Sequence, residues 1–259
     1  MDNDLLIMLG VASAAALASP LGGLVTICIR PSSLLLSIAV GFAAGVLLGT
    51  FAFEMMPKSL EWASVPLVAG GFLIGLTLVY ILDLYVNRWR TAGPEADQKR
   101  EVDRLHRRKR PRGSNVAVLA SGTSAEELIE GMIIGIGVAF EPGVALIVGL
   151  AICIDNLSEG MSIGELVLDE EENDANWQIL GWTSLIGLSV FVSTFTGWFL
   201  LRGLPEAVLG FLFAMGAGGM FYLTITDLVP EAESHQFQQS SAVASAFGFL
   251  LIMALAEMT

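Results

Sequence analysis

Histidine and cysteine are nearly absent from this sequence. Its 259 residues include two of each. His106 and His235 lie outside every long apolar segment, so the sequence excludes a histidine-ligated site inside those segments. Cys28 and Cys153 lie within apolar segments, where we expect them to be small buried hydrophobic residues and not a disulfide.

Charged residues are also scarce. They make up 15% of the chain, whereas 54% of the residues are hydrophobic and the mean hydropathy is +0.69. A soluble domain of this length rarely has such a composition, so the sequence predicts a multi-spanning membrane protein. The net charge of -13 would indicate an acidic surface for binding a partner only if the acids lay on the outside of the protein. The positions of the acids along the chain must therefore be considered before the net charge is interpreted.

Eight apolar segments are long enough to cross a hydrocarbon core of ~30 Å, which takes roughly 20 helical residues each. We expect an all-α integral membrane protein whose single transmembrane domain covers residues 1–259. Because acids and not bases precede the first segment, we interpret it as a retained span and not a signal peptide. The expected helices are Leu5–Ile29, Leu34–Met56, Val65–Val86, Asn115–Phe140, Val144–Leu168, Trp177–Leu201, Pro205–Val229 and Ala242–Glu257.

The basic residues predict how the chain is oriented. Ten of the 13 Lys and Arg residues lie between Arg88 and Arg112. Since cytoplasmic loops carry the excess of basic residues, we expect residues 88–113 to form a mobile cytoplasmic loop in a cell-membrane protein. Both termini are then outside. The loop suits contact with the anionic lipid bilayer, and we expect no nucleic-acid partner because no folded basic domain surrounds it.

Carboxylates occur inside the fourth and fifth apolar segments. A charge at the centre of a bilayer costs roughly 2.5–3.5 kcal/mol, and neither segment contains a Lys or Arg to neutralise one. Residues four apart share a helix face, and a three-residue connector makes the two helices antiparallel neighbours. We therefore expect an oxygen-lined cage that holds protons or a cation. Its acids are Glu126, Glu127, Glu130, Asp155 and Glu159.

A six-residue frame is repeated around these acids. "EGMIIG" spans Glu130–Gly135, and "EGMSIG" spans Glu159–Gly164. The glycines four apart in each frame let helix backbones approach closely, but close packing does not explain the acid before them. Carboxylate ligands favour hard divalent ions such as Mn²⁺ and, less exclusively, Fe²⁺.

The sequence resembles the ZIP (Zrt/Irt-like protein) family of divalent metal transporters. The fourth and fifth segments contain "EELIEG" from Glu126 and "DNLSEG" from Asp155, which resemble the family's His-Asn-x-Pro-Glu-Gly motif. An acid-x-x-Pro ending occurs in the second segment at Glu54 and in the seventh at Asp227. The resemblance implies eight spans, inverted repeats around helices four and five, alternating access and, by analogy, a homodimer.

The resemblance also implies a set of metal ligands. Glu130 and Glu159 match the family's glutamates, and Asn156 matches an asparagine of the fifth helix. By motif position, Glu126 and Asp155 replace the two liganding histidines, and Glu127 replaces an asparagine. The metal would pass between helices two, four, five and seven, with Glu54 and Asp227 as entrance and exit ligands.

Several positions depart from the family pattern. Ile129 and Ser158 replace the motif prolines, which predicts straighter fourth and fifth helices, and Val190 lies near the place of a sixth-span glutamate. We expect a single divalent cation as substrate, with Mn or Fe favoured over Zn, no organic cofactor and no enzymatic activity. The alternatives are a metal-binding or sensing protein that does not transport, a metal-dependent membrane hydrolase, and a proton-coupled permease.

Overall fold

The computed structural model describes residues 2–86, 115–170, 174–234 and 237–258. The predicted basic loop, 88–113, and both histidines lie outside the described residues. Within them, all regular structure is helical, which confirms the predicted fold class.

Each predicted span corresponds to a helical rod. Six rods are single helices: α1 (Asp2–Ile29), α4 (Val65–Val86), α6 (Asn115–Phe140), α7 (Pro142–Glu170), α8 (Ala175–Leu201) and α11 (Gln238–Ala256). The second rod joins α2 (Ser33–Thr50), η1 (Phe51–Met55) and α3 (Met56–Trp62). The seventh joins α9 (Glu206–Leu223), η2 (Thr224–Leu228) and α10 (Val229–Ser234). Within the described residues, 7 rods have the length and hydropathy of a membrane span. The remaining rod, α6, carries three glutamates near its middle.

The rods form two bundles. In the first bundle, α6 packs against α8, and α1 packs against both α7 and α8. In the second bundle, the rod that begins with α2 packs against α11, and α4 packs against α9. The two bundles meet mainly where α2 contacts α7 and where α6 contacts α9. We call this contact surface the seam.

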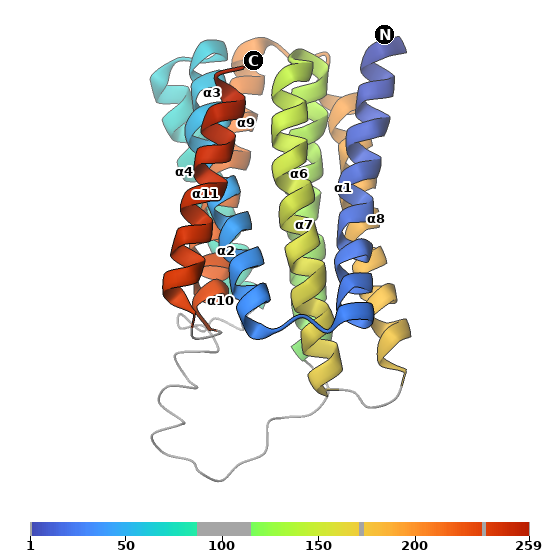
Figure 1. Cartoon of the computed structure of the whole chain (residues 1–259). Coiled ribbons are helices and arrows are strands. Elements are labelled where there is room, and N and C mark those ends of the chain that lie inside the picture. Colours follow the sequence, from blue (N-terminus) through green and yellow to red (C-terminus); the bar gives the residue numbers. More distant parts are fainter. Residues whose placement is uncertain (1, 87–114, 171–173, 235–236, 259) are drawn as a thin grey trace.

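The two ends of the molecule differ in which connections they carry. Both chain termini and the turn between α6 and α7 lie at one end, which we call the termini end (Figure 1). The last turn of α4 and the first turn of α6 lie at the opposite end, which we call the loop end (Figure 1). Termini on the same side agree with an even number of spans.

Glycines allow the helices within each bundle to touch through their backbones. A Cβ atom on Gly160 of α7 would collide with the carbonyl oxygen of Ser19 on α1. A Cβ atom on Gly131 of α6 would collide with Ser193 and Val190 on α8. The glycines of the repeated frame therefore pack α6 onto α8 and α7 onto α1, and not α6 onto α7.

The acid-x-x-Pro endings lie in two π-helical segments. In η1, the N–H of Met56 donates to the carbonyl of Phe51, five residues back, directly before Pro57. In η2, the N–H of Val229 donates in the same way to Thr224, directly before Pro230. Proline has no N–H to donate to the preceding turn, so the helix widens locally there. In contrast α6 and α7, which lack the motif prolines, run without a break.

Candidate metal site in the first bundle

Five of the eight predicted site residues gather where α6 and α7 lie side by side. Glu127, Glu130, Asp155 and Asn156 are buried, with at most 5% of each residue exposed, and Glu159 is partly buried. Glu126 is on α6 as well and is half-buried. The two helices that carry all six residues, α6 and α7, pack against each other. This contact confirms the antiparallel pairing that the short connector predicts.

Hydrogen bonds fix the relative depth of the two helices. The Nδ2 group of Asn156 donates to Glu127 Oε2 at 3.3 Å and to the carbonyl oxygen of Ala15 on α1 at 3.1 Å. On the opposite side of α6, Ser193 Oγ of α8 donates to the backbone oxygen of Glu127 at 3.0 Å. All four helices of the first bundle thus contribute to holding Glu127 and Asn156.

Several buried carboxylate oxygens in this region lack a hydrogen-bond partner. They are Oε2 of Glu130, Oδ1 of Asp155 and Oε2 of Glu159. An unsatisfied buried polar group costs about 1–3 kcal/mol, and more when it is charged. These oxygens are therefore acceptors that a proton or a cation would satisfy.

The same carboxylates repel one another. Glu159 experiences the charges of Asp155, Glu126 and Glu130, and Glu127 experiences those of Glu159 and Asp155. A cation placed among them would be attracted by every one of these groups. Within the residues that the structure describes, however, no three Asp, Glu, His or Cys side chains converge closely enough to bind one ion as they stand. The closed cage remains a prediction.

Glu54 and Asp227 lie apart from this cluster, at opposite ends of the second bundle. Glu54 is 2% exposed in η1, in the half of its rod nearer the termini end. Asp227 is exposed in η2, in the half of its rod nearer the loop end, and its charge acts on Glu126. The roles of these two acids as entrance and exit ligands remain predictions.

Sequence reasoning missed Asp83 near the loop end of α4. Its charge acts on both Glu126 and Asp227, and its Oδ2 accepts a hydrogen bond of 2.6 Å from Tyr222 Oη. The pattern offered one signal, which was a single acid in an otherwise apolar span. That acid belongs to no motif, so only the packing of α4 against α9 showed that it lies near the predicted exit.

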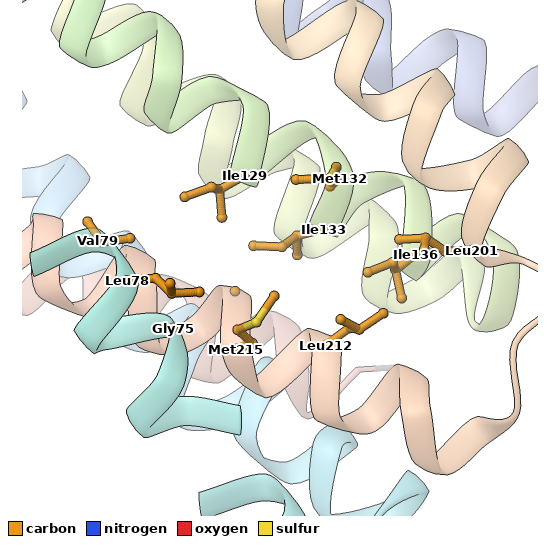
Figure 2. A pocket seen from close by; sticks show the side chains of 12 residues that line it. Gly75, Leu78, Val79, Ile129, Met132, Ile133, Ile136, Leu201, Leu212 and Met215 are labelled. Atoms are coloured by element: carbon orange, nitrogen blue, oxygen red, sulfur yellow. The ribbon is translucent and has the colours of Figure 1, made fainter. Parts of the chain in front are cut away.

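An apolar cavity of about 150 Å³ lies on the seam, separate from the acids. Figure 2 shows Ile129, Met132 and Ile133 of α6 facing Leu78 of α4 and Met215 of α9 across it. Met132 therefore fills apolar space and does not face the carboxylates. The donors of the predicted site itself are carboxylate and amide oxygens.

Comparisons with known proteins agree with this architecture. The sequence model described as "ZIP Zinc transporter" matches residues 5–256. The chain is 27% identical over 242 residues to "Zinc transporter ZupT" of Stenotrophomonas maltophilia (strain R551-3), which covers 88% of this chain and 87% of the relative. It is 27% identical over 245 residues to "Zinc transporter ZupT" of Corynebacterium glutamicum, covering 89% and 90%. It is 23% identical over 300 residues to "Zinc transporter ZIP11" of Bos taurus, covering 84% and 86%.

Proposed function

The chain belongs to the ZIP zinc transporter family, and from this membership we propose that it moves a divalent metal cation across the cell membrane past the carboxylates that α6 and α7 carry in the first bundle. In this proposal Glu130 and Glu159 are the central ligands, and Glu126, Glu127, Asp155 and Asn156 complete the binding region. Glu54 and Asp227 receive and release the ion. The single observation that carries the proposal is the set of buried carboxylate oxygens on α6 and α7 that have no hydrogen-bond partner.

The donor types favour a hard divalent ion. The binding region offers carboxylate and amide oxygens, and the described side chains there include no imidazole. Carboxylates bind Zn²⁺ as well, but nitrogen and sulfur donors usually accompany them in zinc sites. We therefore propose that this chain prefers Mn²⁺ or Fe²⁺ over Zn²⁺, although its named relatives are zinc transporters.

The two bundles supply a mechanism for alternating access. The central ligands lie in the first bundle, whereas Glu54 and Asp227 lie in the second. A rigid movement of one bundle against the other would therefore carry the ion from the level of Glu54 to the level of Asp227. Backbone-to-backbone glycine packing stiffens each bundle internally, which suits a rigid movement along the seam.

Uptake into lipid vesicles tests this function. Purified protein is reconstituted, and uptake of radioactive manganese, iron and zinc is measured singly and in competition. Each of Glu130→Gln and Glu159→Gln removes one negative charge from the ligands of the cation while keeping the shape of the side chain. We expect each to weaken cation affinity by at least about tenfold, equivalent to ~1.4 kcal/mol, and to reduce uptake accordingly.

A matched control is Glu206→Gln, because Glu206 is an exposed acid at the start of α9, far along the chain from the cluster. We expect it to leave uptake unchanged. Metal binding without saturable uptake in any vesicle preparation would contradict transport and favour the metal-sensing alternative. Uptake that survives both glutamine variants would contradict the proposed ligands.

A further inference from the structure

At one place on the seam, side chains and not backbones separate the two bundles. This is the apolar cavity, whose walls come from α6 and the end of α8 on one side and from α4 and α9 on the other (Figure 2). Where a glycine faces the seam, at Gly216 of α9, an added Cβ would meet only the side chain of Ile133 and no backbone atom. Flexible side-chain ends, and not interlocked backbones, therefore separate the bundles here.

Polar and aromatic contacts tie the bundles together at the termini end. Lys58 Nζ of α3 donates to Glu141 Oε1 at 2.9 Å, and Glu141 is the residue that joins α6 to α7. Beside this ion pair, the rings of Trp62 in α3 and Phe140 in α6 lie 5.9 Å apart. Lys58 and Trp62 belong to the second bundle, whereas Phe140 and Glu141 belong to the first.

Like charges face each other across the seam toward the loop end. Glu126 of the first bundle is repelled by Asp227 and Asp83 of the second. The electrostatics of the seam are therefore uneven, with attraction at the termini end and repulsion toward the loop end. Such a distribution favours an arrangement that is shut at the termini end.

We propose that Lys58 and Glu141 form a latch that closes the termini end in this arrangement and must open once in every transport cycle. The proposal rests on the proposed function, because only a protein whose bundles move needs to break this contact. Lys58 also pairs with Glu61 at 3.1 Å within α3, and that partner stays beside it whichever way the bundles move. Glu61 can therefore hold the ammonium group while the latch is open.

Reversible cross-linking in vesicles tests the latch. In a background with Cys28→Ala and Cys153→Ala, the pair Lys58→Cys with Glu141→Cys is joined by a short, reducible bifunctional thiol reagent. We expect manganese uptake to fall at least about tenfold on joining, because the closed arrangement is then the only one populated, and to return on reduction. The matched control is Lys58→Cys with Glu61→Cys, in which the same reagent joins two residues of α3 and should leave uptake unchanged.

The outcomes separate the latch from the proposed function. Uptake by the unjoined wild-type protein reports on transport itself, and its absence would overturn the proposed function together with the latch. If the wild type transports and the joined 58–141 protein transports as fast as the joined control, the latch alone is overturned.

A charge exchange provides a test that needs no cysteine. Ion pairs of this exposure contribute about 0.2–1 kcal/mol, so Lys58→Glu and Glu141→Lys should each change the uptake rate by up to about fivefold. Combining them restores an ion pair of reversed polarity, and we expect the uptake rate to return to within about twofold of wild type. A double variant that is as impaired as the two single effects predict together would count against the latch.

Discussion

At the scale of single residues, the site is defined by what each oxygen contacts. Asn156 uses its amide group to hold Glu127 and the backbone of α1, so one of the Glu127 oxygens already has a partner. Glu130, Asp155 and Glu159 each keep an oxygen without one. Asn156 and Glu127 thus position the bundle around the region in which the other three carboxylates would bind the ion.

Restoring a histidine to the fourth span should change which metal the protein prefers. Glu126→His places an imidazole where the family motif has one, beside Glu130 on the same helix face. Imidazole suits Zn²⁺ better than Mn²⁺, so we expect the ratio of zinc to manganese uptake to rise by about tenfold. Competition between the two ions in vesicles measures this ratio.

The control for that substitution is Leu128→His, since Leu128 lies on the same helix but is 45% exposed on its outer face. Its imidazole would point away from the carboxylates, so the ratio of zinc to manganese uptake should not change. An equal shift in both variants would mean that metal preference does not depend on the donors at position 126.

At the scale of helices, glycines and prolines determine how the rods pack and where they widen. Glycines set how closely helices of one bundle approach, and the prolines after Glu54 and Asp227 produce the π-helical segments that present those acids. Extra residues in a helix turn are frequent at functional sites because they re-aim side chains and leave backbone groups open to a ligand. The rods that carry the central acids lack such segments and are continuous.

A methyl group at Gly160 should separate α7 from α1. Because its Cβ would collide with the backbone oxygen of Ser19, Gly160→Ala forces the two helices apart, and we expect a loss of about 1–3 kcal/mol in the free energy of unfolding. Thermal unfolding of the purified protein in detergent measures the change.

Gly70→Ala is the matched comparison, because a Cβ on Gly70 of α4 has no neighbour within 4 Å. Removing a helical glycine without a collision should leave stability unchanged or raise it by about 0.5–1 kcal/mol. Equal destabilisation by both substitutions would argue that the α1 to α7 contact does not limit stability.

At the scale of the whole molecule, the two bundles carry different acids. The first bundle holds the central carboxylates, and the second holds the acids near both ends of the proposed path. Residues far apart along the chain meet at the seam, where Lys58 reaches Glu141 and Ile133 reaches Gly216. Movement along this seam would expose the same carboxylates to one side and then to the other.

The orientation predicted from the basic residues is also testable at this scale. We expect a reporter that is active only outside the cytoplasm to be active when fused after Thr259 and inactive when inserted between Arg100 and Glu101. Since ten of the 13 basic residues lie in residues 88–112, replacing most of them with glutamine should weaken or reverse this pattern. Activity at both positions would contradict a single orientation.

The sequence by itself determined the eight rods, because apolar length is a property of each segment taken alone. It also predicted, from the cost of a charge inside an apolar segment, which acids would bind the ion. It also indicated that α6 and α7 are neighbours, since their connector is too short for any other arrangement. The tertiary structure decided which surfaces meet. The glycines of the repeated frame turn α6 toward α8 and α7 toward α1, and Lys58 pairs with Glu141 across the seam. Those contacts depend on how helices rotate about their own axes and on residues distant in the chain, which no local pattern specifies.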